Sequence, residues 1–530
     1  MLSFQATPNR VREATKLAYR YGVPVTDSVA TYWQNMPLTT QIPNFNFKLK
    51  PYQAEGVRHL EKWDGNVLLA DEPGLGKTAQ VMAYAFKNHL FPMCVILPKT
   101  LLLNWRREIG LMTGQQLKIQ IVGFVPSKRR QAELLKHEPH VHYFKTPQPG
   151  YDVTLINYDI VHQNVATLEA LAYEYVVCDE SHKIKNIKAQ RSLAVIRLVS
   201  GRVPVKHTRN QWEVLHGGCK RATFCTGTPI VNRPLELWTT VSTIAPWHPD
   251  FATFWGFASK YCDARKTKWG WNFSGHSQLP ELHKTLTDTI MIRRRKQDVL
   301  KELPPKTFIT VPLEFDRAEY DVVARAFEGR GDWKQGMETL VQYGGNPAKS
   351  DEAIVAINKC REIAAYAKLT SVIEWIEDFV EEGAKLVVFA HHQKMVDDIH
   401  DTLKVRGHGV RKIRGGIGLE ERAQAAEDFQ NDPDVKVIVL NIASAGFGIT
   451  LTAASACAFV QLPWTPGDLI QAADRVHRIG QADNVTVYNL VAEHTVEEQI
   501  GDLIITKAEV MNLAVDGGAN QELSTMKLSK

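Results

Sequence analysis

The sequence predicts an α/β protein with two lobes, each built on a parallel β-sheet that is covered by helices. Short apolar runs alternate with helix-like stretches along most of the chain, and the continuous character of these runs is typical of strands buried on both faces. The runs also fall into two series, which are separated by a long helical stretch of mixed charge. The first series comprises 67–70, 94–97, 153–156, 175–178 and 222–225, and the second comprises 386–390, 410–413, 435–440, 457–462 and 485–491.

Length and composition agree with a globular protein of this size. At about 150 residues per domain, 530 residues suggest three or four folding units. Hydrophobic residues make up 44% and charged residues 23%, which excludes a disordered chain, a collagen-like fibre and a small disulfide-stapled scaffold. The net charge of +5 does not by itself indicate nucleic acid.

Cysteine usage and apolar runs predict the compartment. The seven cysteines are scattered with no C-x-x-C pair, which favours a reducing compartment over a zinc site. No apolar run approaches the roughly 18 residues of a membrane span, and the N-terminus has no signal-peptide core. We therefore expect a soluble, cytoplasmic protein that does not engage a membrane.

Segments outside the two series complete the predicted organisation. Thr7 and Pro8 are expected to start a helix that continues through Tyr21 and caps the next domain. Residues 201–221 form a basic insertion that is a candidate for contact with duplex DNA. The predicted domains are an N-terminal helical segment at 1–45, lobe 1 at 46–316 with a helical protrusion at about 235–305, and lobe 2 at 317–530 with a helical insertion at about 320–370 and C-terminal brace helices.

The sharpest motif is VLLADEPGLGKT at residues 67–78, where an apolar strand runs into a glycine-rich loop and then a helix. Glycines let backbone N–H groups approach phosphate oxygens, and the N-terminus of the helix favours negative charge. Lys77 is expected to reach the β- and γ-phosphates of ATP, and Thr78 to ligate Mg²⁺. The alternative is a turn with a chance GKT, since the strict pattern has Gly at position 71. The predicted nucleotide contacts of the loop are Asp71, Gly74, Leu75, Gly76, Lys77 and Thr78.

A second motif, YEYVVCDESH at residues 173–182, places two acids at the end of an apolar strand. Ligands of parallel sheets bind at this end of the strands. Asp179 is suited to hold Mg²⁺, and Glu180 is suited to orient and deprotonate the attacking water. Adjacent acids also occur by chance at helix starts, but the phosphate loop in the same predicted sheet favours the catalytic interpretation.

A third motif is QAADRVHRIGQ at residues 471–481. Gln471, Arg475 and Arg478 have the spacing i, i+4 and i+7, which predicts one helix face carrying all three. Two guanidinium groups on one face can stabilise charge that develops on a γ-phosphate, as arginine fingers do. The alternative is a solvated basic face.

With these motifs in order, the chain resembles the superfamily-two helicase-like ATPases, and within them the Swi/Snf family. The resemblance covers roughly residues 48–512 and also rests on TGTPIVN at 226–232, FWGFASKYCDA at 254–264, MIRRRKQDVLKELPPK at 291–306 and SAGFGITLTAAS at 444–455. It implies two RecA-like lobes, ATP and Mg²⁺ as cofactors, and Gln53 as the adenine-contacting glutamine. Gln471 is then a further nucleotide contact.

Within this family, some segments are most similar to those of the HARP-type annealing helicases, which remodel stalled forks and rewind strands. These segments are VVFAHH at 387–392, ERAQAAEDFQ at 421–430, GITLTAAS at 448–455, LPWTPGDLIQAADRVHRIGQ at 462–481 and YNLVAEHTVEEQI at 488–500. Pro73 stands where the family usually has Met, and Ala473 where it has Glu. We therefore expect a DNA-dependent ATPase that translocates on duplex or forked DNA. The alternatives are a strand-separating DNA or RNA helicase, a non-hydrolysing scaffold and a chromatin remodeller. A compact core with short flanks favours a bacterial or phage host over a nucleus.

The resemblance also implies where nucleic acid would lie. A motor without sequence preference is expected to contact the phosphate backbone. The densest basic run, at 293–296, is expected to contact DNA or to couple the lobes, and its alternative is a solvated helix face. Asn157, Asn186 and Thr452 could instead be turn or capping residues. The candidate DNA contacts are Lys99, Asn157, Lys185, Asn186, Thr228, Arg293, Ser444 and Thr452.

Overall fold

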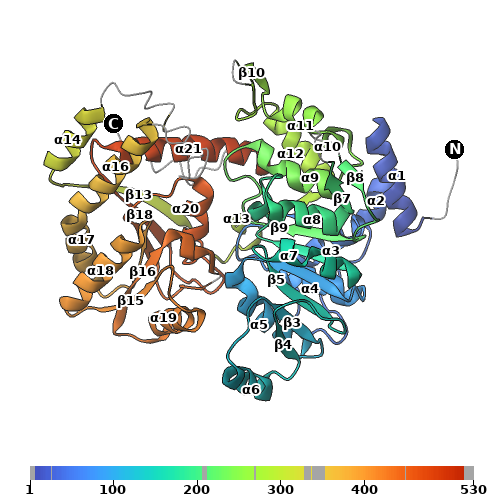
Figure 1. Ribbon diagram of the computed structural model, residues 1–530, viewed down its shortest axis with the longest axis horizontal. Helices are drawn as coiled ribbons and strands as arrows, with labels where there is room; N and C mark the ends of the chain where they lie inside the picture. Colours follow the sequence, from blue (N-terminus) through green and yellow to red (C-terminus); the bar gives the residue numbers. More distant parts are fainter. Residues whose placement is uncertain are drawn as a thin grey trace. The chain divides into compact units, whose positions relative to one another are not determined.

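The structure is a computed structural model that describes residues 6–25, 27–205, 212–267, 270–327, 336, 352–447 and 449–518. The chain forms two compact units, Met1–Arg295 and Lys296–Lys530 (Figure 1). Each unit contains one large parallel sheet flanked by helices, so the predicted α/β class and the two-sheet arrangement are confirmed.

The sheet of the first unit has eight strands in the order β12-β1-β9-β6-β2-β5-β3-β4, and every neighbouring pair is parallel. Its central strands are buried on both faces, which explains their continuous apolar sequences. All five runs of the first predicted series are strands of this sheet. The strands are β1 (Val67–Leu69), β2 (Met93–Leu97), β3 (Ile119–Val122), β4 (Val141–Phe144), β5 (Val153–Asn157), β6 (Tyr175–Asp179), β9 (Ala222–Cys225) and β12 (Met291–Ile292).

The helices of the first unit begin with α1 (Pro8–Tyr21), which has the bounds that Thr7-Pro8 predicted. Arg12 on α1 donates to the carbonyl oxygens of Glu61 and Lys62, so this helix packs on the unit as the predicted cap. The others are α2 (Asp27–Gln34), α3 (Pro51–Lys62), α4 (Lys77–Lys87), α5 (Leu102–Thr113), α6 (Lys128–His137), α7 (Val161–Ala170), α8 (Gln190–Ser200), α9 (Trp238–Ile244), α10 (Pro249–Ala252), α11 (Phe254–Tyr261) and α12 (Leu279–Asp288), with short 3₁₀ turns at Lys99–Leu101, Ser181–Ile184 and Pro234–Leu237.

Two small antiparallel hairpins are added to this unit. The first pairs β7 (Arg202–Pro204) with β8 (Trp212–Val214), so the predicted basic insertion contains a β-hairpin. Its residues 206–211, which include Lys206, His207 and Arg209, lie outside the described residues. The second pairs β10 (Arg265–Thr267) with β11 (Gly270–Asn272), within the stretch predicted as a helical protrusion.

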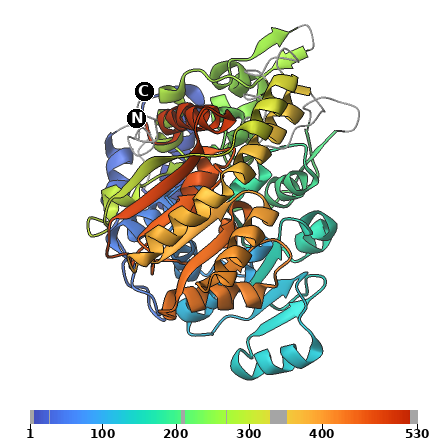
Figure 2. The same ribbon diagram turned by 90° about the vertical axis from the view of Figure 1, so that its left-hand side faces the viewer.

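The sheet of the second unit has six parallel strands in the order β13-β18-β17-β14-β16-β15. Figure 2 shows helices of this unit lying across its strands. The strands are β13 (Lys306–Leu313), β14 (Leu386–Ala390), β15 (Gly409–Ile413), β16 (Val435–Asn441), β17 (Ala456–Phe459) and β18 (Val485–Ala492), and the helices are α13 (Lys296–Val299), α14 (Ala318–Phe327), α16 (Glu352–Ala367), α17 (Leu369–Glu381), α18 (Gln393–Val405), α19 (Leu419–Asn431), α20 (Pro466–Ala473) and α21 (Val496–Val515), with a 3₁₀ segment at Ile442–Phe447.

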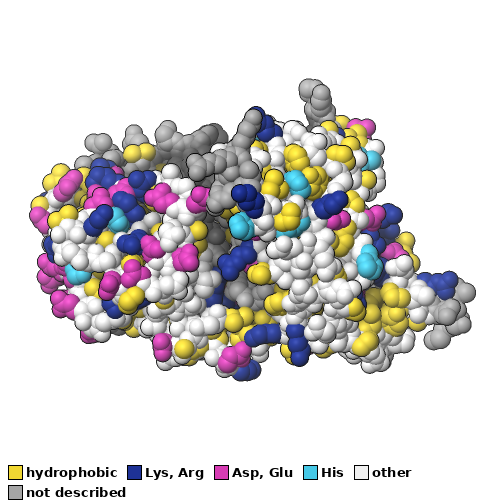
Figure 3. Space-filling view, turned by 90° about the horizontal axis from the view of Figure 1, so that it is seen from below, with side chains coloured by type: hydrophobic (Ala, Val, Ile, Leu, Met, Phe, Trp, Pro, Cys, Tyr) yellow, Lys and Arg dark blue, Asp and Glu magenta, His cyan; other side chains and the backbone are white. Residues whose placement is uncertain are grey.

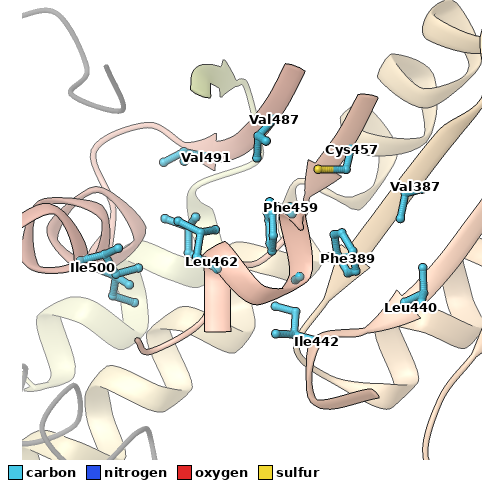
Figure 4. Close-up of a cluster of buried hydrophobic side chains, with 14 of the residues drawn as sticks. Val387, Phe389, Leu440, Ile442, Cys457, Phe459, Leu462, Val487, Val491 and Ile500 are labelled. Carbon is cyan, nitrogen blue, oxygen red and sulfur yellow. The ribbon is translucent and has the colours of Figure 1, made fainter. Parts of the chain in front are cut away.

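The core of the second unit lies between this sheet and α16, α20 and α21 (Figure 4). Phe389 on β14 stacks on Phe459 on β17, with ring centroids 4.9 Å apart. Because β13 pairs with β18 along its whole length, the second unit starts before residue 316, where we expected the boundary. Most of the predicted insertion at about 320–370 is helical where it is described, and residues 328–335 and 337–351 lie outside the described residues.

On the face of the second unit that Figure 3 shows, acidic and basic side chains are interspersed rather than sorted by sign. Lys412 lies 2.8 Å from Asp397, for example, and Arg406 pairs with Glu377. In the part of the chain that the structure describes, no helix has both the length and the apolar character needed to cross a membrane.

Candidate functional site

The glycine-rich loop between β1 and α4 has the backbone of a phosphate-binding loop. Gly74 and Gly76 have φ angles of 89° and 75°. Residues that carry a Cβ atom rarely adopt such positive φ angles. A Cβ atom on Gly76 would also lie 2.4 Å from Nε2 of Gln53. No side chain caps the N-terminus of α4, and no acidic residue lies in its first turn. These features leave a positive helix end that is suited to an anion.

Lys77 and Gln53 both face the backbone of this loop. The Lys77 ammonium donates to the carbonyl oxygens of Asp71 at 2.7 Å and Glu72 at 3.2 Å. Nε2 of Gln53 donates to the Leu75 carbonyl at 3.2 Å, and its Oε1 accepts from the Lys50 amide at 2.9 Å. A bound phosphate would therefore compete with loop carbonyl groups for Lys77, and Gln53 lies directly against the loop.

The acidic pair lies at the carboxyl end of β6, two strands from β1 in the same sheet. Asp179 accepts at Oδ1 from the Glu180 amide at 2.9 Å and at Oδ2 from the indole Nε1 of Trp105 at 2.7 Å. Burial, and then the neighbouring Glu180 carboxylate, raise the pKa of Asp179. A bound divalent cation would lower this pKa again, because it stabilises the charged carboxylate. The surroundings of Asp179 therefore suit a Mg²⁺ site.

Glu180 has a backbone conformation that is uncommon for a side-chain-bearing residue. Its φ and ψ are 49° and 51°, in the left-handed region, immediately before the 3₁₀ turn at Ser181–Ile184. Such geometry at a strand end is typical of functional positions. Oε2 of Glu180 lies 3.3 Å from Nδ1 of His182, which also contacts the Thr226 hydroxyl at 3.3 Å. The acidic pair is thus joined to the TGTP segment that follows β9.

Sequence reasoning missed Trp105 and Tyr158, which hold the acidic pair. Trp105 on α5 is 1% exposed and donates to the Asp179 carboxylate. The hydroxyl of Tyr158 donates to the Asp179 carbonyl at 2.8 Å. Both residues lie in segments that contain charged residues, NWRRE and NYD, but nothing in these segments indicates a contact with an acidic residue 74 or 21 positions away.

We expect Trp105→Phe to slow ATP hydrolysis and to raise the Mg²⁺ concentration that gives the half-maximal rate. The substitution keeps an aromatic ring but removes the donor to a buried carboxylate, which costs about 1–3 kcal/mol. Magnesium titrations of steady-state hydrolysis would measure the effect. An unchanged rate and an unchanged magnesium requirement would show that the hydrogen bond has no role in positioning Asp179.

The side chain of Asp71 takes part in a buried ion pair. Its side chain is 0% exposed, and its carboxylate accepts from Nε of Arg294 at 2.9 Å, from Nη2 of Arg294 at 2.5 Å and from Gln80 at 2.9 Å. The Asp71 carboxylate is thus already paired within the protein, and a contact of residue 71 with nucleotide stays a prediction.

Arg293 is also held by contacts within the first unit. Its Nη1 donates to the carbonyl oxygens of Ala70 at 2.8 Å and Gly227 at 2.9 Å, and its side chain is 10% exposed. Strand β12 runs beside β1 and brings the following arginines against the phosphate loop, and a contact of Arg293 with DNA stays a prediction. Arg293 thereby connects the start of that loop to the TGTP segment, where the ring of Pro73 also packs beside Gly227.

The other candidate DNA contacts of the first unit differ in exposure. Lys99 and Asn186 are exposed, and Asn186 also accepts from the Lys188 amide as a turn residue. Lys185 pairs with Glu236 at 3.1 Å. Asn157 is 4% exposed and accepts from the Asp159 amide, and Thr228 is 8% exposed. The structure therefore favours the turn interpretation for Asn157, while Lys99, Lys185, Asn186 and Thr228 stay predictions.

In the second unit, the predicted helix face does not form. Helix α20 ends at Ala473, so Gln471 lies on it while Arg475 and Arg478 lie in the irregular turn that follows. Asp474, the first residue after α20, is buried and lies 3.0 Å from both Lys296 and Lys306. Burial alone would raise the pKa of Asp474, but the two ammonium groups hold it well below its usual value. Arg478 donates to the Thr450 hydroxyl at 3.2 Å.

Ser444 and Thr452 lie in neighbouring segments of the second unit. Ser444 is 4% exposed within the 3₁₀ segment Ile442–Phe447. The hydroxyl of Thr452 accepts from Gln430 at 3.4 Å. Both remain predicted DNA contacts.

We expect His477 to make the second unit less stable in acid. Burial, and then Lys306 and Lys296, lower the pKa of His477 to about 4, and its Nε2 donates to the Pro304 carbonyl at 2.7 Å. The unfolded chain binds this proton near pH 6.5, so stability falls as the pH drops from there toward 4, by about 1.4 kcal/mol per pH unit.

The His477→Gln variant keeps an N–H donor but cannot titrate. Between pH 7.5 and 5 the wild type is expected to lose about 2 kcal/mol more free energy of unfolding than the variant, as measured by urea unfolding. His276→Gln, at an exposed position, is the control. Equal pH dependence in wild type and His477→Gln would contradict the assignment.

Comparison with known families decides where the chain belongs. The SNF2-related domain matches residues 52–205 and 206–353, and the helicase conserved C-terminal domain matches residues 367–480. The chain belongs to the SNF2-related family. The two SNF2-related segments meet inside the predicted basic insertion, and the predicted Swi/Snf resemblance is confirmed.

Several named proteins are similar to this SNF2-related chain. One is "SWI/SNF-related matrix-associated actin-dependent regulator of chromatin subfamily A-like protein 1" of Xenopus tropicalis, 31% identical over 477 residues, or 89% of this chain and 45% of the relative. Another is "DNA annealing helicase and endonuclease ZRANB3" of Mus musculus, which is 31% identical over 480 residues. The matched region covers 89% of this chain and 41% of that relative. The chain thus spans less than half the length of these relatives.

A solved structure, "Sulfolobus solfataricus SWI2/SNF2 ATPase core in complex with dsDNA", is 26% identical in sequence to this chain. The match covers 93% of this chain and 97% of the solved chain, with a TM-score of 0.39. The curated relatives include proteins from frog, mouse and human. They do not support the expected preference for a bacterial or phage host.

Proposed function

We propose that this protein is a DNA-dependent ATPase that translocates on double-stranded or forked DNA, in repair, recombination or fork remodelling. The observation that carries the proposal is the shared sheet edge at which the Lys77 loop and the Asp179–Glu180 pair both lie, separated by β9. A phosphate-binding loop beside a metal-binding and a water-activating carboxylate is the arrangement that nucleotide hydrolysis requires. The names of the annealing-helicase relatives support DNA as the polymer.

The residues of the first unit fit ATP and Mg²⁺. Lys77 would exchange its two carbonyl partners for phosphate oxygens, and the uncapped amides of α4 would hold the same group. Thr78 and Asp179 would hold Mg²⁺, which supplies charge neutralisation when bound. Glu180 would accept the proton of the attacking water. Gln53, Gly74, Leu75 and Gly76 are proposed to shape the nucleotide pocket, and Gln471, Arg475 and Arg478 to contribute from the second unit.

Steady-state ATP hydrolysis with different nucleic acids tests the proposal. The arms are no nucleic acid, duplex DNA, single-stranded DNA, forked DNA and RNA, with Glu180→Gln as the blank. Strong stimulation by duplex or forked DNA is the expected result. Stimulation by single strands or RNA alone would favour a strand-separating helicase, and no hydrolysis with any polymer would favour a non-hydrolysing scaffold.

A further inference from the structure

We propose that an exposed aromatic hairpin on the first unit binds the unpaired bases of a nucleic acid strand. The hairpin consists of β10 and β11 with Trp271 on β11 and the adjoining Phe273, and it packs beside Trp255 on α11. In Figures 1 and 2 it projects beyond the helices of its own unit. This inference deepens the proposed function by naming a second contact for the same polymer.

The aromatic rings form a continuous series from the interior to the surface. Trp238 is buried at 6% exposed, and its ring lies 5.8 Å from that of Phe254. Phe254 contacts Phe273 at 5.2 Å, and Phe273 lies parallel to Trp271 at 6.4 Å with an interplanar angle of 11°. Trp255 lies 4.9 Å from Trp271. The outer rings are therefore held in fixed positions by the inner ones.

The outer rings remain accessible. Trp255 is 43% exposed and Trp271 is 51% exposed, and all six residues of β10 and β11 are exposed. A two-stranded hairpin is only marginally stable alone, so its contacts with α11 hold it in place. Large aromatic side chains that are anchored at one end and open to water at the other mark a binding surface.

The charge around these rings favours nucleic acid over an apolar or basic partner. In the described part of the hairpin, the basic residues Arg265 and Lys266 lie on β10 and the aromatic residue Trp271 on β11, followed by Phe273. The side chain of Arg265 is 75% exposed, although it pairs with Asp263 at 2.7 Å, and Lys266 is also exposed. Single-strand binders combine such cations, which attract the phosphate backbone, with aromatic rings on which bases stack.

Stacking selects unpaired bases. In a duplex each base already stacks on its neighbours, whereas a displaced or single strand presents both faces of its bases. Trp271 and Trp255 could each stack on one base, and the cations would follow the adjoining phosphates. A duplex would meet only the cations of this hairpin.

Trp271→Ala is the test, because removal of an exposed ring should not prevent folding. Binding is measured by fluorescence anisotropy with single strands of DNA and RNA of about 20 nucleotides and a blunt duplex of the same length. Loss of one stacked base should weaken single-strand binding about 5- to 150-fold. Duplex binding by Trp271→Ala should change less than about twofold. Trp271→Phe should keep most of the wild-type affinity for single strands, because a smaller ring can still stack.

Tyr21→Ala, which removes an exposed aromatic ring from α1, is the matched control and should bind like the wild type. Unchanged single-strand binding by Trp271→Ala would overturn the inference, and would leave a protein partner as the occupant of this surface. Equal losses with single strand and duplex would also overturn it, since they would indicate backbone contact alone. Equal losses with DNA and RNA single strands would support it, because stacking does not depend on the sugar.

The binding assay does not depend on hydrolysis. If no nucleic acid stimulated ATPase activity, the proposed function would fail, yet a selective single-strand defect in Trp271→Ala would still support the hairpin as a base-binding surface. If duplex DNA stimulated hydrolysis and Trp271→Ala bound single strands normally, the proposed function would be supported and the inference about the hairpin would fail.

Discussion

Glu180→Gln is expected to lower the rate of ATP hydrolysis by about 10²–10⁴-fold while ATP still binds. The amide side chain has nearly the same shape but cannot accept the proton of the attacking water. The backbone N–H of residue 180 would still donate to Asp179, so the metal-binding carboxylate should keep its position. Single-turnover hydrolysis and equilibrium binding of a fluorescent ATP analogue measure the two quantities separately.

Lys77→Ala serves as the contrasting variant. It removes the ammonium group from the loop and should weaken ATP binding itself, by about 10- to 100-fold for a charge-assisted hydrogen bond. Normal turnover in Glu180→Gln would remove Glu180 from its role. Unchanged ATP affinity in Lys77→Ala would count against the loop as the phosphate site.

Arg294→Ala is expected to destabilise the first unit by about 3–5 kcal/mol, because it leaves the Asp71 carboxylate charged and buried. Arg294 and Asp71 have side chains 10% and 0% exposed and lie 2.5 Å apart. Arg294 also donates to Gln80 and to the Tyr52 carbonyl, so the position of the phosphate loop depends on it. Urea unfolding of the full chain would measure the loss, and ATP affinity should fall with it.

Two variants distinguish the effect of an unpaired buried charge from the effect of a general loss of packing. Lys284→Ala breaks an ion pair with Asp288 whose side chains are 74% and 42% exposed, and should cost at most about 1 kcal/mol. The double variant Asp71→Leu with Arg294→Met replaces both charges by apolar groups and should recover much of the stability. If Arg294→Ala were no more harmful than Lys284→Ala, the buried ion pair would not be the main support of the loop.

Features set by neighbouring residues could be predicted from the sequence alone. The strand, glycine turn and helix around Lys77 follow from local preferences, as does the helix that begins after Thr7 and ends before Gly22. The buried strands were recognisable because burial on both faces of a parallel sheet requires continuous apolar runs. The order of the motifs also sufficed to identify the family.

Only the tertiary structure determined the roles of Asp71, Arg293, Arg294 and Trp105. Arg294 is 223 positions from Asp71, and Trp105 is 74 positions from Asp179, so no local pattern relates them. The ion pairs of Asp474 are likewise not visible in the sequence, since Lys296 and Lys306 reach it from a distant part of the chain. A motif specifies which chemical groups are present, but the partner that each group meets depends on which strands become neighbours, and here β12 beside β1 brings Arg293 and Arg294 against the phosphate loop.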